Sequence, residues 1–327
     1  MQKEKGMYLE PIALFPAFRS GAATPWGGTL LREALGKNIP DAHTGESLEM
    51  SVISGLHSVD AEGRPLESLL DQDWAGMAGT KVQKPFPLLL KLIDAQDRLS
   101  VQVHPDDDYA RREENKLGKT EAWAILQAEP GAQLVYGIKE GVTKAELSAA
   151  AQDGEAIEKL LRFVPVKPGD VFYIPAGTVH AIGAGILLYE IQQSSDVTYR
   201  FYDWNRRDKD GKLRPLHIRQ ALDVTRVDYQ PEAIVPEAVD APHCRREILL
   251  DTEYFGLERL KDCRDVPFAG AVTHFSVLTL LTEGTLCLLD TNEALSLSAG
   301  QTVFIPADCA PFTLTCGECL IASPAHK

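Results

Sequence analysis

Two segments far apart in the chain carry side chains that could bind one metal ion. Residues 99–105 read LSVQVHP and residues 169–180 read GDVFYIPAGTVH. Alternate side chains of a β-strand point to the same face, so Ser100, Gln102 and His104 are expected to lie together. A hydroxyl, an amide and an imidazole buried without partners cost about 1–3 kcal/mol each. A bound metal ion and a polar substrate would supply those partners.

The second segment predicts both a further ligand and a fold. Its pattern, G-x5-P-x-G-x2-H, is typical of cupin β-barrels and ends at His180. We expect His180 to join Gln102 and His104 at one metal ion, with Glu121, at the start of the next predicted strand, completing the set. Two imidazoles, a carboxylate and an amide suit zinc, with manganese, iron and cobalt as alternatives. Because an amide is a weak ligand, Gln102 could bind either the metal or the substrate.

A degraded copy of this pattern lies near the C-terminus. Residues 300–308 read GQTVFIPAD, which repeats G-x5-P-x, but Pro311 stands where the first copy has His180. The second copy has therefore kept the turn and lost the ligand. We expect a mainly β fold, a double cupin of two jelly-roll β-barrels, with helical insertions in the N-terminal part and no metal at the second turn.

The stretch between residues 230 and 242 divides these parts. It holds three prolines and several acidic residues, which favour an extended linker. The sequence therefore predicts a catalytic cupin domain with helical insertions over residues 1–235. A degenerate cupin-like β domain is expected over residues 236–327.

Local patterns indicate the elements that position the site. The apolar run of residues 87–94, a polar turn and residues 99–104 predict a β-hairpin. The box Thr143–Glu146 predicts a helix start. Further strands are expected near residues 122–127, 170–174, 185–192 and 198–203, and further helices after His104, up to Gly118, and over residues 155–162 and 216–224.

Bulk composition excludes several function classes. The 327-residue chain has a formal net charge of −14, so nucleic acid and anionic membranes are not expected partners. No apolar run approaches the ~18–20 residues of a membrane span, and the start resembles no signal peptide.

The six cysteines lie between Cys244 and Cys319 and are expected to be reduced thiols of a cytoplasmic protein. The lone CxxC of residues 316–319 is interpreted as a turn between two strands rather than a redox or zinc site.

The chain resembles the type I mannose-6-phosphate isomerases, the zinc-dependent phosphomannose isomerases, in their short bacterial form. The segment LSVQVHP is the most specific of the shared motifs. The others are residues 26–28 (WGG), 45–51 (GESLEMS), 118–123 (GKTEAW), 175–180 (PAGTVH) and 195–200 (SDVTYR). The resemblance implies one Zn²⁺ per chain, with ligands at Gln102, His104, Glu121 and His180. It places the family's active-site arginine at Arg200.

One departure from the family bears on the mechanism. Longer members read His-Lys-Pro-Glu where this chain has residues 118–121, GKTE, so a proton shuttle on that histidine cannot apply. Lys119, Glu121 and a zinc-bound water remain as candidate bases. Arg200, on a predicted strand face with Thr198 and Tyr202, is expected to stabilise developing negative charge, because guanidinium stays protonated.

The resemblance implies an aldose–ketose isomerase that interconverts D-mannose 6-phosphate and D-fructose 6-phosphate through an enediol or enediolate. The partner is then a small phosphorylated hexose, and Ser100, Lys91 and Lys119 are the expected phosphate or hydroxyl contacts. A non-catalytic metallocupin that senses sugar phosphate is the alternative. A dioxygenase-type cupin is less consistent, because Gln102 stands where such proteins carry the first histidine of a His-x-His pair.

Overall fold

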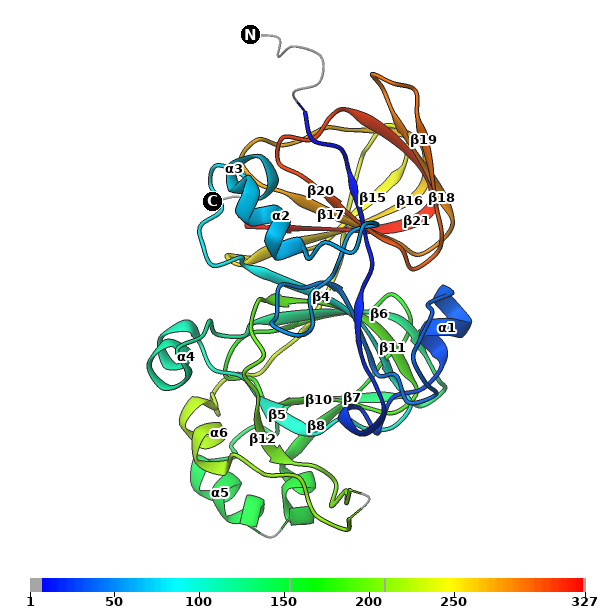
Figure 1. The fold of residues 1–327 in the computed structure, drawn as a ribbon. Coiled ribbons are helices and arrows are strands. Elements are labelled where there is room, and N and C mark those ends of the chain that lie inside the picture. The colour runs from blue at the N-terminus through cyan, green and yellow to red at the C-terminus, as the bar shows by residue number, and fades with distance from the viewer. Residues whose placement is uncertain (1–7, 153, 209, 326–327) are drawn as a thin grey trace.

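The fold is mainly β and forms two lobes (Figure 1). The computed structural model describes residues 8–152, 154–208 and 210–325. Three antiparallel sheets account for the named strands of these residues. In Figure 1 the nine-stranded sheet forms the upper lobe, and the seven- and five-stranded sheets form two layers of the lower lobe.

The seven-stranded sheet is the central layer. Its strands, in spatial order, are β13 (Ala233–Ile234), β9 (Val171–Ile174), β6 (Glu121–Ala128), β11 (Ile186–Gln193), β4 (Leu88–Ala95), β3 (Glu46–Met50) and β2 (Ala17–Arg19). The five-stranded sheet below it contains β12 (Tyr199–Tyr202), β5 (Val101–Val103), β10 (His180–Ile182), β7 (Gln133–Ile138) and β8 (Leu161–Pro165).

The nine-stranded sheet holds the C-terminal part of the chain and one N-terminal strand. Its main path is β1 (Ile12–Leu14), β20 (Thr302–Ile305), β17 (Ser276–Leu280), β21 (Phe312–Pro324), β16 (Phe255–Phe268), β15 (Arg245–Asp251) and β14 (Glu237–Val239). β18 (Gly284–Leu288) and β19 (Ala294–Leu297) extend it beside β21. The linker segment thus bridges the lobes, since β13 pairs in one sheet and β14 in the other.

Among the described residues, no helix extends beyond Val224. The helices are α1 (Leu30–Leu35), α2 (Leu66–Gln72), α3 (Trp74–Met77), α4 (Asp107–Glu114), α5 (Lys144–Gln152) and α6 (Ile218–Val224), with short 3₁₀ turns η1 (Gly21–Ala23) and η2 (Gly154–Leu160). The predicted capping box is confirmed, because Thr143 and Glu146 bond reciprocally before α5. None of the helices in the described ranges is long and apolar enough to cross a membrane.

The central sheet is buried on both faces, and alternation along β4 shows why. Leu88, Leu90 and Leu92 belong to a core shared with the nine-stranded sheet, whereas Leu89 and Lys91 line a pocket on the other side. This period of two lets one strand serve the interlobe core and the pocket together. It also explains why β4 reads as a nearly continuous apolar run.

Three local predictions are wrong. β4 and β5 do not form a hairpin, because β4 pairs with β3 and β11 while β5 pairs with β10 and β12. The CxxC segment is not a turn but part of the long strand β21. Residues 155–162 do not form an α-helix; η2 ends at Leu160 and β8 begins at Leu161. The strands concerned, β4, β21 and β8, are each paired with strands distant in sequence.

The two copies of the cupin-type turn fold alike. Gly169 and Gly300 adopt left-handed backbone angles, with φ of 93° and 77°, which favour glycine. Each precedes a four-residue strand, β9 or β20. The Pro175 carbonyl then accepts a hydrogen bond from the amide three residues on at 3.1 Å, and the Pro306 carbonyl does so at 3.2 Å. The repeat read from the sequence therefore corresponds to a repeated local structure.

Candidate metal centre

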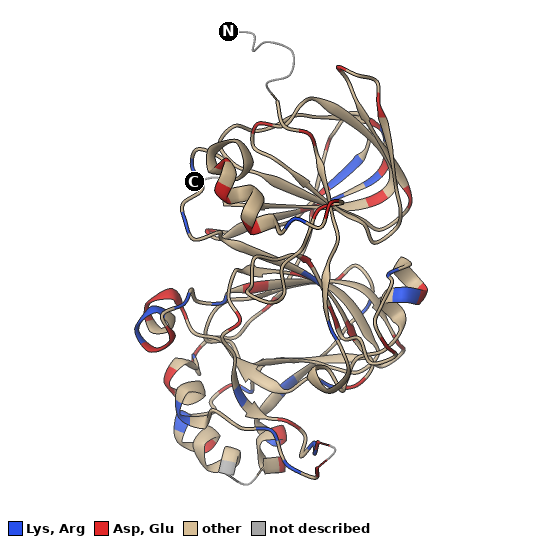
Figure 2. Ribbon diagram, viewed as in Figure 1, with Lys and Arg blue, Asp and Glu red and all other residues tan. Residues whose placement is uncertain are grey.

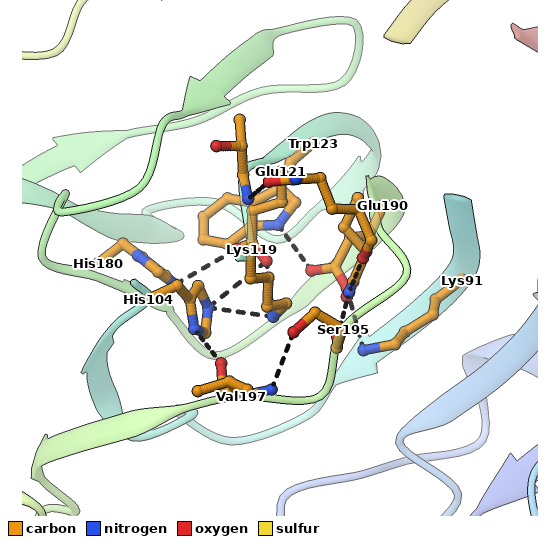
Figure 3. A network of polar contacts seen from close by, with 12 residues as sticks. Lys91, His104, Lys119, Glu121, Trp123, His180, Glu190, Ser195 and Val197 are labelled. Atoms are coloured by element: carbon orange, nitrogen blue, oxygen red, sulfur yellow. Dashed lines mark hydrogen bonds and ion pairs between the residues drawn. The ribbon is translucent and has the colours of Figure 1, made fainter. Parts of the chain in front are cut away.

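Three predicted ligands meet between the two sheets of the lower lobe (Figure 3). His104 directly follows β5, and His180 begins β10, which pairs with β5 so that His180 lies opposite Gln102. Glu121 begins β6 in the facing seven-stranded sheet. The ligand atoms of His104, Glu121 and His180 lie within 4.8 Å of one another, and all three residues are buried.

Hydrogen bonds orient both imidazoles. His104 Nδ1 lies 2.8 Å from the Val197 carbonyl oxygen, and His180 Nδ1 lies 2.9 Å from that of Thr178. A carbonyl oxygen only accepts, so each Nδ1 must carry a proton. In the neutral rings Nε2 then presents a lone pair. Second partners of this kind typically orient histidines that bind metals.

The electrostatics favour a cation among these atoms. Burial lowers the pKa of His180 to about 3 and that of His104 well below its usual value, so both rings are neutral. Their lone pairs face the Glu121 carboxylate, with His180 Nε2 at 3.3 Å from Oε1 and His104 Nε2 at 3.5 Å from Oε2. Within the described ranges, His180 Nε2 and Glu121 Oε1 have no hydrogen-bond donor. Converging acceptors without donors fit a metal ion with nitrogen and oxygen ligands.

Lys119 connects this centre to a pocket. Its Nζ lies 2.7 Å from Glu121 Oε2 and 3.0 Å from His104 Nε2. Burial raises the pKa of Glu121 to about 7, although Lys119 acts in the opposite direction. Lys119 also lines the pocket. It therefore lies between the buried Glu121 carboxylate and the pocket.

The pocket has a volume of about 120 Å³ and lies beside the metal centre. It brings together the predicted substrate contacts, the predicted arginine and the predicted amide, which are Ser100, Lys91, Lys119, Arg200 and Gln102. A larger surface hollow, of about 1120 Å³, shares only Arg214 with this pocket and contains none of these residues. The smaller pocket is therefore the candidate substrate site.

Lys91 is held by two carboxylates. Its Nζ lies 3.1 Å from Glu190 Oε1 and 3.6 Å from Glu46 Oε1. Burial opposes the charge of Lys91, but the two carboxylates outweigh it and raise its pKa. Burial alone would raise the pKa of Glu190, but the positive charges of Lys91 and Lys119 outweigh burial and lower this pKa to about 2. The Trp123 indole donates to Glu190 Oε2 at 2.9 Å, as Figure 3 shows. Lys91 thus lies in the pocket as one member of a buried ion-pair network.

Arg200 lies across from the amide. It is opposite Gln102 in the β12–β5 register, and its Nε donates to Ser100 Oγ at 3.1 Å. The register shifts after Arg200, and Tyr202 instead donates to Glu158 and lines the larger hollow. The prediction that Tyr202 shares the face of Arg200 is therefore wrong, because a bulge redirects it.

Sequence reasoning missed several charged residues of the pocket. Arg19, Arg214, Glu46 and Glu190 all line it. A signal existed for Glu190, since it is the one charged residue of the apolar strand β11. In the structure it lies directly opposite Lys91 in the β4–β11 register. No comparable signal marked Arg214, which follows β12 in a connecting segment. Acidic and basic residues are interspersed along the ribbon of both lobes (Figure 2), so charge alone does not distinguish these residues.

Fold and site together describe a mainly β protein with a buried metal-type centre that opens on a small charged pocket. Residues 18–150 match the family model described as phosphomannose isomerase type I, catalytic domain. The chain is 41% identical to mannose-6-phosphate isomerase ManA of Bacillus subtilis over 77% of this chain and 79% of that protein.

Solved structures of mannose 6-phosphate isomerases also match the chain. The crystal structure of the Bacillus subtilis mannose 6-phosphate isomerase matches with a TM-score of 0.88 and 33% identity, over 96% of this chain and 99% of that chain. A mannose 6-phosphate isomerase crystallised with zinc and yttrium shares the fold, with a TM-score of 0.75 and 16% identity over 97% of this chain and 100% of that chain. The chain belongs to the type I phosphomannose isomerase family.

Proposed function

We propose that this enzyme interconverts D-mannose 6-phosphate and D-fructose 6-phosphate in the pocket beside His104, Glu121 and His180. The observation that carries the proposal is Lys119, which contacts the metal-type centre and lines the pocket. The chain matches relatives named mannose-6-phosphate isomerase over most of their length, which supports this substrate. Family membership does not favour the alternative of a non-catalytic sugar-phosphate sensor.

Zn²⁺ is the ion proposed for the centre, one ion held by His104, Glu121 and His180. Two buried imidazole nitrogens and a carboxylate are a donor set that zinc accepts readily. Gln102 is proposed as the further ligand, because it lies opposite His180 on the neighbouring strand. Bound there, zinc would polarise oxygens of the sugar.

Proton transfer between carbons 1 and 2 is assigned to Lys119, with Glu121 as its buried partner. The reaction needs a group that accepts a proton from one carbon and returns it to the next. Lys119 lines the pocket, whereas Glu121 is fully buried behind it. The 2.7 Å contact between the two would let the carboxylate hold the amine in place.

Arg200 and Ser100 are assigned to the substrate's negative charge. The guanidinium is fixed by Ser100 and by the Pro215 carbonyl, at 3.1 and 3.2 Å. A preoriented donor of this kind stabilises charge that develops on oxygen during reaction. Lys91 is proposed as a further contact to phosphate or hydroxyl groups, through its position in the pocket.

The architecture proposed for this site is a double cupin with helical insertions in its N-terminal part. The catalytic unit comprises residues 1–235, and residues 236–327 form the degenerate cupin-like unit. The change of sheet between β13 and β14 supports this boundary. The strand β1, which pairs with β20, ties the start of the chain to the second unit.

A coupled assay tests the proposed function. Mannose 6-phosphate is supplied with and without a chelator, and fructose 6-phosphate is measured, while substrate binding is followed by calorimetry. We expect turnover that chelation removes and added Zn²⁺ restores. Substrate binding without turnover in metal-loaded protein would instead establish the sensor, and full turnover after complete metal removal would contradict the metal assignment.

A further inference from the structure

A second group of metal-type ligands lies in the nine-stranded sheet, away from the site described above. Cys263, Cys316 and Cys319 are buried free thiols whose sulfur atoms lie within 4.8 Å of one another. Among the described residues, this group and the His104 centre are the two clusters of at least three such ligands. The CxxC motif thus acquires a third thiol from a distant strand.

The strands explain this convergence. Cys263 of β16 lies directly opposite Cys316 of β21, and the register shifts immediately beyond that pair. Asp262 and Asp265 flank the shift with left-handed φ values of 55° and 49°, the geometry of a bulge. Within the same motif β21 changes neighbours, from β17 at Cys319 to β18 at Cys316. The motif therefore occupies a corner of the sheet, where the two thiols can face the same point.

A fourth thiol lies beside the group. Cys244 immediately precedes β15, and the adjoining backbone is held to β16 by a bond of 2.9 Å from the Arg264 amide to the His243 carbonyl. Its thiol hydrogen-bonds with that of Cys263. Cys244 therefore lies at the edge of the three-thiol cluster, next to Cys263.

We propose that Cys244, Cys263, Cys316 and Cys319 bind a second metal ion, Zn²⁺, at a structural site. Tetrahedral zinc with Zn–S bonds of about 2.3 Å places its sulfur ligands roughly 3.8 Å apart, so the three buried sulfurs need only a small contraction. Four thiolates would close the coordination sphere, which is typical of structural rather than catalytic zinc.

Contacts among the thiols support this proposal, because Cys316 hydrogen-bonds with both Cys263 and Cys319. When Zn²⁺ binds, the thiols release their protons to solvent. The ion would fasten β16, β21 and the segment before β15 at one corner of the sheet. This raises the expected metal content from one ion per chain to two.

Metal analysis of the full-length protein, purified under reducing conditions with zinc in the growth medium, tests the site. We expect two zinc ions per chain in the unmodified protein and one in Cys316→Ser, which keeps its isomerase turnover. His104→Ala should also hold one ion but lose turnover. Cys287→Ser is the matched control, because this half-buried thiol lies outside the cluster, and should hold two.

Cobalt substitution provides a readout that does not depend on a folded variant. Co²⁺ bound by thiolates gives a sulfur-to-metal charge-transfer band, which imidazole and carboxylate ligands do not produce. We expect this band in the cobalt-loaded unmodified protein and in His104→Ala. One zinc per chain without this band, or a disulfide within the cluster in freshly reduced protein, would overturn the proposal. Those outcomes leave the isomerase assignment intact, since it is measured by turnover.

Discussion

Two copies of one turn, residues 169–180 and 300–311, differ in what surrounds them. The first ends at His180, whose Nε2 faces Glu121 at 3.3 Å. The second ends at Pro311, just before β21, and its strand residues Val303 and Ile305 belong to an apolar core. The backbone of the two turns is nevertheless alike, from the left-handed glycine to the turn after proline.

This difference shows that the turn is a scaffold and that its chemistry comes from other strands. In the first copy β5 delivers His104 and the facing sheet delivers Glu121. In the C-terminal lobe, Val303 and Ile305 of the second copy pack in an apolar core, and no described His, Asp or Glu joins a metal-type cluster there. A single ligand placed on the turn would not make a metal site unless its neighbours also changed.

The largest expected effect is loss of the proposed ligands at the His104 centre. His104→Ala and His180→Ala should each abolish isomerase turnover and lower the metal bound there, since each removes a proposed direct ligand. Turnover and metal content by mass spectrometry are the measurements. Full metal occupancy in both variants would show that the ligands were misassigned.

Arg200→Ala should lower turnover by a factor on the order of 10²–10³, which is typical for loss of one donor to a developing oxyanion. Metal content should not change, because guanidinium is not a zinc ligand. Arg200→Lys should recover only part of the rate, since a point charge does not reproduce the planar fork. Unchanged turnover with a raised Michaelis constant would make Arg200 a binding residue alone.

A smaller effect is expected on the free energy of unfolding, where the buried Glu190 ion pair of the lower lobe should matter more than a partly exposed pair of the nine-stranded sheet. Because the pKa of Glu190 is lowered to about 2, its stabilising contribution is present above its unfolded pKa, near 4.5, and is lost as pH falls from there toward 2. Glu190→Gln should reduce the free energy of unfolding at pH 7 by about 3 kcal/mol and flatten its pH dependence in that window.

The control for that measurement lies in the nine-stranded sheet. Glu258 pairs with Arg246 at 2.6 and 2.7 Å, but both side chains are partly exposed. Glu258→Gln should therefore change the free energy of unfolding by only ~0–1 kcal/mol. Equal losses in the two variants, measured by chemical denaturation, would contradict the contrast drawn between buried and exposed pairs.

The smallest effect is expected in the second turn itself. Asp308→Ala should leave turnover within about twofold of the unmodified enzyme, because surface and scaffold substitutions remote from a site have small effects. The metal bound at the His104 centre should also stay the same. A large fall in turnover in folded Asp308→Ala protein would show that the second copy takes part in the reaction.

The sequence was most informative where the signal is local. Alternation in LSVQVHP and the glycine, proline and histidine spacing were enough to bring His104 and His180 together, and Glu121 was added because it begins the next predicted strand. Most predicted strands appear within a residue or two, as β6, β9, β11 and β12 do. Period and turn chemistry depend on neighbours in sequence, which a single chain displays directly.

What the sequence did not disclose depends on contacts between distant segments. The pairing of β4 with β11 rather than β5 is decided by sheet packing, not by the short turn between the strands. The bulge that redirects Tyr202 has no glycine or proline to mark it. The CxxC motif forms a metal-type cluster only together with Cys263, which lies on β16 and is distant in sequence.

Anomalous diffraction at the zinc absorption edge, from crystals of the full-length protein grown with Zn²⁺, tests the central claim most directly. The turn of residues 169–180 is expected to hold the catalytic metal, so a strong peak should lie within bonding distance of His104 Nε2, Glu121 and His180 Nε2. No peak should lie at Pro311. Absence of the first peak in fully active crystals, or zinc bound at the second turn, would contradict the claim.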